Sequence, residues 1–386
     1  MLTGLQVLMR DNFAPLEGCR IGLVVNHISV ADDLLPSYIH FLKNPALQLG
    51  RIFAPEHGLW GVAQDQEKVS TSIDSHTGQQ IVSLYGSRLA PTAEMIADLD
   101  VLVFDVQDIG ARYYTFIYTV LLMMKECARF GKKCLILDRP NPLGGLKREG
   151  NILDKQYSSF VGLYPLPVVH GLTVGEIASY INTSFNLGCE LQVIACEGWQ
   201  RAMYYDETGL VWIPPSPNMP TLQTALVYPG CCLFEGTNIS EGRGTTLPFE
   251  MVGAPWIDPW AWVSELNKLN LSGVTFRPLF FKPLTNKYAG QICGGVQIHV
   301  SDRTQFPAYF NGIAMIKTAH DLYPEQFAWK SPPYEFETER LPIDILTGTN
   351  LIRRNIEDGD HISLVSAGWD QGIAEFEARV AHYLLY

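Results

Sequence analysis

The chain has 386 residues, of which 47% are hydrophobic and 18% charged, with 33 Gly, 24 Pro and a net charge of −12. Such a chain buries a sizeable core in two or three domains of ~150 residues each. Its acidic balance argues against non-specific binding to nucleic acid or to anionic membranes. The eight cysteines form no Cys-x-x-Cys pair and mostly lie in apolar runs, so we expect buried free thiols.

The first residues of the chain contain neither a basic stretch nor a long apolar segment. They therefore predict the first helix of a domain and not a signal peptide. No apolar run reaches the ~18 residues that a bilayer-spanning helix needs. From these two observations we expect a cytoplasmic protein with no membrane partner.

Apolar runs alternate with helical patterns through the first half of the chain. Strands are predicted at residues 20–26, 47–53, 101–108, 133–138 and 191–195, with a short extended segment at 81–86. Helices are predicted at residues 33–43, 92–99, 115–130 and 173–182, the last opened by a capping box of Thr173 and Glu176. This alternation favours βαβ units and a mostly parallel α/β sheet.

The composition changes between residues 213 and 230, where five prolines occur. Because proline interrupts helices and sheets, we expect neither a core helix nor a central strand there, and we place the domain change in this segment. The second half is predicted to be α+β, with helices at 259–269 and 306–322, a strand at 296–300, a polar loop and a C-terminal helix. The predicted domains are residues 1–226 and 227–386.

Polar side chains follow three of the predicted strands, at the point where each strand ends. These residues are Glu56 and His57, then Asp105, Gln107, Asp108 and Arg112, and finally Asp138, Arg139 and Asn141. Since parallel strands end at one edge of a sheet, all three groups are expected to line a common cleft. A fourth cluster, at residues 234–246, sets Glu235, Glu241 and Arg243 among small residues that allow close approach to a polar ligand.

The predicted cleft is rich in carboxylates, amides and aromatic rings such as that of Tyr114, which is a candidate stacking face for a sugar. No dinucleotide-binding, P-loop, α/β-hydrolase or zincin motif occurs, so no cofactor is predicted. Such a cleft suits carbohydrate hydrolysis, which needs a carboxylic acid to protonate the leaving oxygen. Glu56, in a loop with apolar neighbours, is the predicted general acid. Glu241 and Asp108 both stay open as the second catalytic carboxylate.

Seven short motifs follow one another along the chain, at residues 55–58, 83–86, 104–115, 137–142, 170–173, 215–220 and 235–246. The first reads Pro-Glu-His-Gly, and the third reads Phe-Asp-Val-Gln-Asp-Ile-Gly-Ala-Arg-Tyr-Tyr-Thr. Together they resemble the exo-β-N-acetylmuramidases of the NamZ family, formerly a domain family of unknown function. The resemblance runs from about Gly22 to the C-terminus.

This resemblance implies a Rossmann-like N-terminal domain that carries the active site, followed by a smaller C-terminal α+β domain. The implied activity is release of terminal N-acetylmuramic acid (MurNAc) from the non-reducing ends of peptidoglycan fragments, such as the disaccharide MurNAc-GlcNAc. The implied partner is thus a small amino-sugar substrate, with no metal and no nucleic acid. The glutamate of the family's Pro-Glu-His-Gly motif falls on Glu56, in agreement with the choice made from the residues.

The implied substrate predicts a role for the arginines in these motifs. MurNAc has a lactyl carboxylate, which a planar guanidinium can bind through two hydrogen bonds. Arg112 and Arg243 are the candidates, although an ion pair of Arg112 with Asp108 that only shapes the loop is equally open. The other predicted substrate-binding residues lie in the same motifs: His57, Gln107, Tyr114, Asp138, Asn141, His170, Asn218 and Glu235.

Two other classes of function stay open at this stage. A metal-dependent hydrolase or deacetylase acting on the same sugars would use converging strand-end residues such as Asp105, Asp108 and His57, and would lose activity on chelation. A non-catalytic muropeptide-binding sensor would bind the sugar without turning it over.

Overall fold

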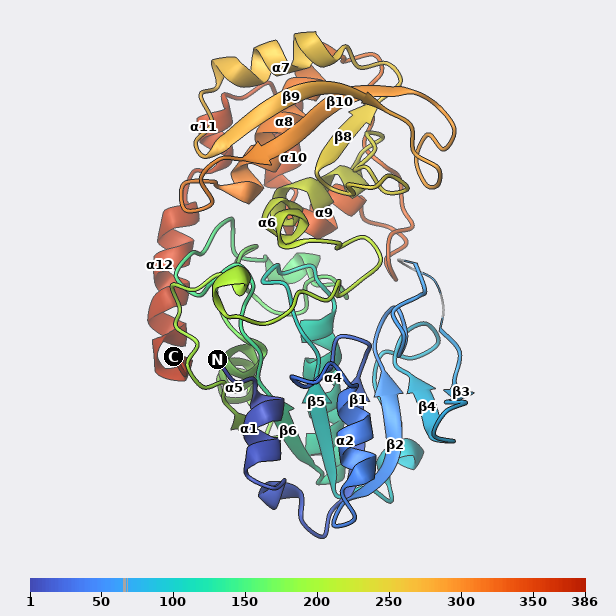
Figure 1. Ribbon diagram of the computed structural model, residues 1–386. Coiled ribbons are helices and arrows are strands. Elements are labelled where there is room, and N and C mark those ends of the chain that lie inside the picture. The colour runs from blue at the N-terminus through green and yellow to red at the C-terminus, as the bar shows by residue number, and fades with distance from the viewer. Residues whose placement is uncertain (65–66, 68) are drawn as a thin grey trace.

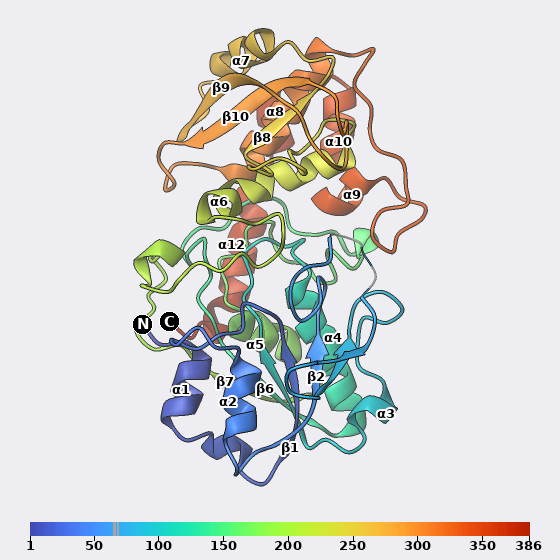
Figure 2. The ribbon, with the colours of Figure 1, turned by 45° about the vertical axis from the view of Figure 1, so that its right-hand side comes forward.

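The computed structural model describes residues 1–64, 67 and 69–386. Figures 1 and 2 show two lobes, a larger one built on a seven-stranded sheet and a smaller one built on a three-stranded sheet. Six of the seven strands run parallel, and only β3 is antiparallel to its neighbour β4. The predicted α/β fold, with a Rossmann-like sheet followed by a smaller α+β domain, is confirmed.

The larger lobe alternates strands with helices, as the sequence predicts. Its strands are β1 (Arg20–Val25), β2 (Gln48–Ala54), β3 (Ser72–Ile73), β4 (Gln80–Ser83), β5 (Val101–Asp105), β6 (Lys133–Leu137) and β7 (Glu190–Ile194). Its helices are α1 (Gly4–Arg10), α2 (Ser37–Lys43), α3 (Ala93–Ile96), α4 (Phe116–Phe130) and α5 (Val174–Ser184). Short 3-10 turns lie at Ala14–Leu16, Lys155–Tyr157 and Tyr205–Glu207.

The order of the strands in the sheet is β3-β4-β2-β1-β5-β6-β7. The chain therefore builds outward from β1 in one direction through β2, then returns to the other side of β1 with β5 and continues to β7. This reversal leaves a crevice at the carboxyl ends of β1 and β5, which is where sheets of this kind usually bind ligands.

Helices cover both faces of the sheet, so its strands are apolar on both sides. On β1, Leu23 packs in one core with α1 and α2, whereas Val24 packs in the other with α4 and α5. Val103 and Phe104 on β5 divide in the same way. This alternation follows from successive side chains of a strand pointing to opposite faces.

Helix ends follow local chemistry. Thr173 and Glu176 form the predicted capping box at the start of α5, and Gly131 ends α4 in the left-handed conformation with φ 63°. Predicted helix 33–43 begins only at Ser37, because residues 31–35 form a turn and Pro36 stands before the helix. Seven of the eight cysteines are buried and all are free thiols, as expected.

The smaller lobe contains an antiparallel sheet in the order β8-β10-β9 and a set of helices. Its elements are α6 (Leu222–Cys231), a 3-10 turn at Cys232–Gly236, β8 (Met251–Ala254), α7 (Pro259–Lys268), β9 (Val274–Phe281), β10 (Cys293–Val300), α8 (Ala308–Leu322), α9 (Pro342–Thr347), α10 (Leu351–Glu357) and α11 (Ile362–Val365). Sequence patterns missed β8 and β9, and the predicted polar loop after α8 contains the short helices α9 to α11.

The prediction that the proline-rich segment contains no core helix was wrong. Helix α6 lies at its end, includes Pro229 and is buried along most of its length. Pro229 has no backbone N–H and so gives up one helix hydrogen bond, but it stands only two residues before the helix ends, and its carbonyl accepts a hydrogen bond from the Tyr113 hydroxyl. The helix also crosses α8 closely: a Cβ on Gly230 would lie 2.0 Å from the Ala308 carbonyl oxygen.

The C-terminal helix α12 (Trp369–Val380) leaves the smaller lobe and runs along the larger one, and the chain ends beside its own start (Figures 1 and 2). Phe376 on α12 packs edge-on against Tyr180 on α5, with ring centroids 5.9 Å apart. A final turn at Ala381–Tyr383 follows. The boundary at 226/227 falls inside α6 and stays a prediction.

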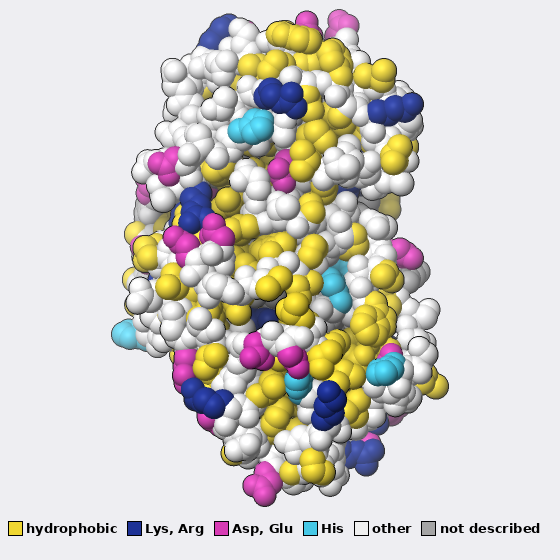
Figure 3. Space-filling model, viewed as in Figure 1, with side chains coloured by type: hydrophobic (Ala, Val, Ile, Leu, Met, Phe, Trp, Pro, Cys, Tyr) yellow, Lys and Arg dark blue, Asp and Glu magenta, His cyan; other side chains and the backbone are white. Residues whose placement is uncertain are grey.

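The surface reflects the sparse charge of the sequence. Charged side chains are scattered over the face shown in Figure 3, and hydrophobic side chains gather over its middle. Within the described ranges, no helix has both the length and the apolarity that crossing a membrane requires.

Candidate active site

Glu56 and His57 lie where the sequence predicts, just beyond the carboxyl end of β2, and both are buried. The Thr115 hydroxyl donates to Glu56 Oε2 over 2.6 Å. Thr115 is the N-cap residue of α4 and makes no capping bond with its side chain, so its hydroxyl is committed to Glu56. His57 has a left-handed φ of 69° and is 2.8 Å from the Ala63 carbonyl through Nδ1. These contacts fix both side chains at the edge of the sheet.

Tyr85 connects Glu56 with a carboxylate from the smaller lobe. Its hydroxyl donates to Glu335 Oε2 over 3.0 Å. Burial raises the pKa of Tyr85 far above its usual value, and the facing carboxylates of Glu56 and Glu335 add to this shift. Glu335 has a left-handed φ of 51°, a conformation that non-glycine residues rarely adopt and that often marks functional positions.

The smaller lobe contributes a buried cluster around Glu235. Arg243 Nη2 donates to Glu235 Oε1 over 2.7 Å, and the Tyr334 hydroxyl donates to Oε2 over 2.7 Å. The Arg243 guanidinium also lies over the Phe249 ring, 4.9 Å from its centroid. A charged pair so enclosed is held in one geometry by its hydrogen bonds.

These groups from both lobes line one narrow cavity, which has a volume of about 40 Å³. Six of the predicted site residues line it, namely Glu56, His57, Tyr114, Asn218, Glu235 and Arg243. Its other walls are Tyr113, Thr115, Phe116, Val161, Ser216, Tyr228, Phe249, Tyr334 and Glu335. Burial raises the pKa of Tyr114 well above its usual value, so this residue presents a neutral hydroxyl.

The two residues predicted as second catalytic carboxylate do not line the cavity. Glu241 lies behind Arg243, with Oε2 2.9 Å from Lys287 Nζ and Oε1 3.5 Å from Arg243 Nε. Burial opposes the charge of Glu241, but Lys287 and Arg243 together hold its pKa below the usual value. Asp108 Oδ2 accepts from the Gly110 backbone over 2.7 Å and faces His170 Nε2 at 3.2 Å. Both carboxylates thus hold neighbouring residues in place and do not face the cavity.

Arg112 is completely buried and is not among the cavity residues. In the described part of the protein Arg112 forms no ion pair with Asp108, and its contact with the lactyl carboxylate stays a prediction. Its guanidinium donates instead to four backbone carbonyls, those of Asn151 and Leu166 in the larger lobe and of Leu346 and Thr347 at the end of α9. Arg112 therefore joins distant segments of the chain.

Asp138, Asn141 and His170 also stabilise loops. Asp138 accepts hydrogen bonds from Thr173 Oγ1, the Gly175 backbone and the Tyr386 hydroxyl, at 2.6, 2.9 and 2.7 Å. Burial raises its pKa to about 6. Asn141 bridges the backbone of its own loop to that of residue 172, and His170 Nδ1 accepts from the residue 172 amide. None of the three lines the cavity.

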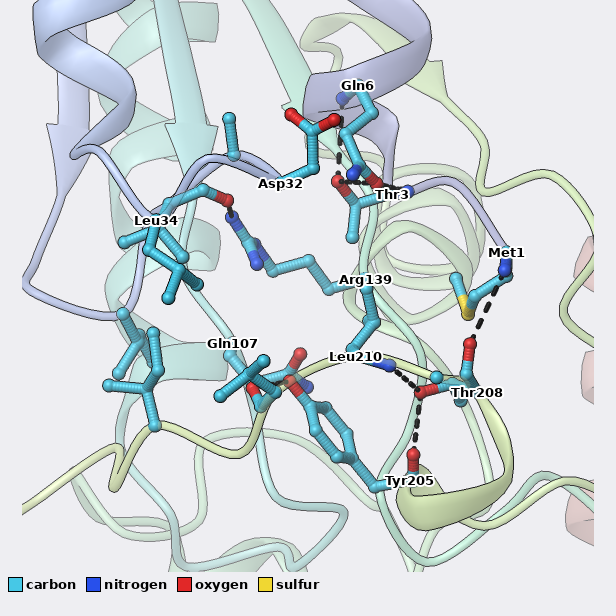
Figure 4. A pocket seen from close by; sticks show the side chains of 16 residues that line it. Met1, Thr3, Gln6, Asp32, Leu34, Gln107, Arg139, Tyr205, Thr208 and Leu210 are labelled. Atoms are coloured by element: carbon cyan, nitrogen blue, oxygen red, sulfur yellow. Dashed lines mark hydrogen bonds between the residues drawn. The ribbon is translucent and has the colours of Figure 1, made fainter.

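Gln107 faces a different space. It lines a larger crevice, of about 300 Å³, that lies beyond the ends of β1, β5 and β6 (Figure 4). The strand-end residues therefore divide between two cavities and a set of loop contacts.

Sequence reasoning missed several cavity residues. Glu335 and Tyr334 come from a loop far along the chain that carries no recognised motif, and only the packing of the two lobes brings them to Glu56. Thr115 and Ser216 lie in the motifs at residues 104–115 and 215–220, so their place in these motifs could have identified them as site residues. Trp60, an aromatic residue three positions after His57, is 51% exposed and is not among the cavity residues. In the described part of the chain, no three His, Cys, Asp or Glu side chains are grouped as a metal site would require.

Comparison with known proteins identifies the family of this chain. Family models described as Exo-beta-N-acetylmuramidase NamZ, N-terminal, and Exo-beta-N-acetylmuramidase NamZ, C-terminal, match residues 21–223 and 226–386. The chain belongs to the NamZ family. The peptidoglycan beta-N-acetylmuramidase NamZ of Bacillus subtilis (strain 168) is 44% identical over 384 residues, which cover 100% of this chain and 91% of the relative.

The NamZ fold is also present in two crystal structures of DUF1343 family proteins from Bacteroides fragilis NCTC 9343. One is 35% identical with a TM-score of 0.91, and the other is 30% identical with a TM-score of 0.78. Each comparison covers 100% of this chain and 98% of the other. Both lobes of the NamZ family member described here are thus shared with these proteins.

Proposed function

We propose that this protein is an exo-acting β-N-acetylmuramidase, a glycoside hydrolase that releases terminal MurNAc from the non-reducing ends of peptidoglycan fragments such as MurNAc-GlcNAc. Membership of the NamZ family over the whole chain supports this activity. The observation that carries the mechanism is the cavity between the lobes, in which a buried glutamate of the family motif meets polar groups of the smaller lobe.

Glu56 is the general acid of this proposal. Glycoside hydrolysis needs a carboxylic acid beside the scissile oxygen, and the partner group is a second carboxylate or the acetamido group of the substrate. Glu56 lines the cavity, is only 6% exposed and is held by Thr115, so its carboxyl group is fixed for proton delivery. His57 beside it is a ligand for a sugar hydroxyl.

Glu335 and Glu235 replace Glu241 and Asp108 as candidates for the second carboxylate, because they line the cavity. The Tyr85 hydroxyl donates to Glu335, and the Glu56 carboxylate faces the same tyrosine, so the two carboxylates lie on either side of one ring hydroxyl. Glu235 is bonded to Arg243 and Tyr334, an environment that suits a substrate ligand more than a nucleophile.

Arg243 is the proposed partner of the lactyl carboxylate of MurNAc. Arg243 lines the cavity, and a guanidinium can bind a carboxylate through two parallel hydrogen bonds. Because Glu235 already neutralises part of its charge, the incoming carboxylate has to share Arg243 with Glu235. Tyr114 and Asn218 complete the proposed sugar contacts.

The cavity at Glu56 is narrow, since only about 40 Å³ of it is open to the centres of water-sized molecules. Its walls come from both lobes, so we propose that the lobes move apart to admit the substrate and close on it afterwards.

The test is release of free MurNAc from MurNAc-GlcNAc by the wild type and by Glu56→Gln, each with and without EDTA. The proposal predicts turnover that EDTA does not change and that falls by about 10²–10⁴-fold in the variant. Glu250→Gln is the matched control, since Glu250 is buried, accepts from Thr224 over 2.6 Å and is not a cavity residue.

Each other outcome points elsewhere. Loss of turnover with EDTA would favour a metal-dependent hydrolase. Binding of the disaccharide without turnover by the wild type would favour a sensor. Full turnover by Glu56→Gln would contradict the assignment of the acid and direct the search to Glu335 and Glu235.

A further inference from the structure

The larger crevice lies at the point where the order of the sheet reverses. Its walls come from the loops after β1, β5 and β6, carrying Val30, Gln107 and Arg139, and from residues 208–213 (Figure 4). Its volume of about 300 Å³ is at the lower end of the ~300–1,000 Å³ typical of small-molecule sites. Open α/β sheets bind their ligands at this position. The proposed muramidase site leaves this crevice without a role.

Gln107 brings an unsatisfied acceptor to this crevice. Its Nε2 donates to the backbone carbonyls of Asp108 and Pro140, at 2.7 and 2.8 Å, so the orientation of the amide is set. Its Oε1 has no hydrogen-bond partner in the described part of the protein, although the residue is only 5% exposed. A buried amide oxygen without a partner costs free energy, which a ligand or water that donates to it recovers.

Arg139 brings donors without excess charge. Its Nε donates to Asp105 Oδ1 over 2.7 Å, and its Nη2 donates to the Val30 carbonyl over 3.3 Å. Neither bond uses Nη1. Figure 4 shows the side chain crossing the crevice toward the loop of Leu34. Asp105 balances the guanidinium, and the ammonium group of Met1 offsets exposed Asp32 at the rim, so the crevice has little net charge and favours a neutral ligand.

The remaining walls are apolar or weakly polar. Tyr205 is buried, and its hydroxyl donates to the Val211 carbonyl over 3.1 Å. Ile28, Leu210 and Ile213 complete an apolar side, while Thr3 and Gln6 from the start of the chain supply polar groups. A ring face beside hydroxyl and amide groups is the usual environment of a bound sugar.

We propose that this crevice is a second binding site, which takes a neutral, hydroxylated molecule of monosaccharide size. Neighbouring hydroxyl or acetamido groups of the ligand donate to Gln107 Oε1 and accept from Arg139 Nη1. The apolar side of the ring lies toward Tyr205 and Leu210. This site is separate from the cavity at Glu56, and its existence does not depend on the proposed hydrolysis.

One segment separates the two sites. Val211 and Ile213 line the crevice, whereas Ser216 and Asn218 line the cavity at Glu56. His27 Nε2 lies 2.7 Å from the Pro214 carbonyl between them. A ligand in the crevice therefore contacts one side of a wall whose other side contacts the substrate.

The test is isothermal titration calorimetry, which measures Kd. The neutral probes are N-acetylglucosamine and glucose, and the anionic probes are D-lactate and MurNAc. The chains are the wild type, Gln107→Leu, and Leu210→Trp, which fills the crevice. Leu364→Trp, at a position 52% exposed on α11, is the control for the added ring. Turnover of MurNAc-GlcNAc by Leu210→Trp, which is expected within twofold of wild type, verifies folding and the separate cavity.

The proposal predicts that a neutral probe binds the wild type and the control, with Kd raised at least tenfold in Gln107→Leu and Leu210→Trp. Unchanged Kd in both variants would overturn it by placing the sugar elsewhere. Absence of neutral-probe binding by the wild type at tens of millimolar would also overturn it. So would tighter binding of D-lactate or MurNAc that is lost in Leu210→Trp and therefore occurs in the crevice. A wild-type crystal soaked in N-acetylglucosamine tests the location independently of any variant. Muramidase turnover is measured separately, so either proposal can fail alone.

Discussion

Single residues show that a polar side chain at a strand end can serve structure as readily as chemistry. Arg112 and Asp138 both follow strands and both stand in motifs shared with the NamZ family. Arg112 donates hydrogen bonds to four backbone carbonyls, and Asp138 accepts three hydrogen bonds near the start of α5. Glu56, two positions after its strand, faces a cavity instead.

Arg112→Lys is expected to destabilise the protein by about 3 kcal/mol, because a lysine cannot reach four separate carbonyls and leaves buried acceptors without donors. The free energy of unfolding in urea measures the loss. If Arg112 is structural, KM for MurNAc-GlcNAc stays within about twofold of wild type for the folded fraction. A tenfold rise in KM with unchanged stability would instead make it a substrate ligand.

Asp138 predicts a pH dependence of stability. Its pKa is raised from 3.8 to about 6, so the folded protein holds a proton that the unfolded chain releases. Stability therefore falls as pH rises from about 4 to 6 and is level above, with a total loss of about 3 kcal/mol from this group. Unfolding of the wild type relative to Asp138→Asn, from pH 4 to 8, isolates this contribution. A difference that does not vary with pH would contradict it.

At the scale of elements, the contact of α6 with α8 depends on two glycines. A Cβ on Gly230 would lie 2.0 Å from the Ala308 carbonyl oxygen, and one on Gly312 would lie 2.3 Å from the Gly230 carbonyl oxygen. Backbone atoms cannot move aside as a flexible side chain can, so this crossing requires glycine on both helices.

Gly230→Ala is accordingly expected to lower the free energy of unfolding by about 3 kcal/mol or more, because the helices must move apart. Gly372→Ala on α12 is the control: its Cβ would lie 3.3 Å from Ile152 Cγ1, a side-chain atom that can shift by a few tenths of an ångström, and alanine favours the helix by about 1 kcal/mol. Thermal unfolding of both variants checks the contrast. Equal effects of the two changes would show that the close crossing is unimportant.

At the scale of the whole molecule, the lobes meet over the cavity at Glu56, and α12 returns to bind the larger lobe. Tyr85 donates to Glu335 across this junction, and Tyr85 also packs against Phe336, with ring centroids 5.7 Å apart. Tyr113 and Tyr114 of the larger lobe also pack edge-on against Tyr228 on α6, with ring centroids 5.7 and 5.9 Å apart, so aromatic contacts and the Tyr85 hydrogen bond together hold this junction.

Tyr85→Phe removes the hydroxyl bond and keeps the ring. We expect kcat/KM on MurNAc-GlcNAc to fall about tenfold, because Glu335 loses the bond that positions it. The free energy of unfolding is expected to fall by about 1.5–3 kcal/mol, the contribution of a hydrogen bond to a charged group. Steady-state kinetics beside thermal unfolding measures this. Wild-type kinetics in the variant would show that the contact has no part in closure or in the placement of Glu335.

The sequence supports the fold and the first half of the site, for identifiable reasons. Strand runs are long and apolar, so their ends and their shared edge are predictable, and Glu56 follows from them. Gln107 and Asp108 are neighbours beyond the end of β5, yet their side chains diverge, one to the crevice and one toward His170, which no sequence pattern predicts. Glu335 reaches the cavity only through the packing of the lobes, which no local pattern encodes.

The role of Glu56 as general acid is tested most directly by changing the leaving group. In a 2,4-dinitrophenyl β-glycoside of MurNAc, the dinitrophenolate leaves without being protonated. The GlcNAc oxygen of MurNAc-GlcNAc has to be protonated by the acid as it leaves. For Glu56→Gln, we expect kcat/KM to fall by about 10²-fold or more on the disaccharide and by less than about tenfold on the dinitrophenyl glycoside. Equal losses on the two substrates would contradict the acid role of Glu56.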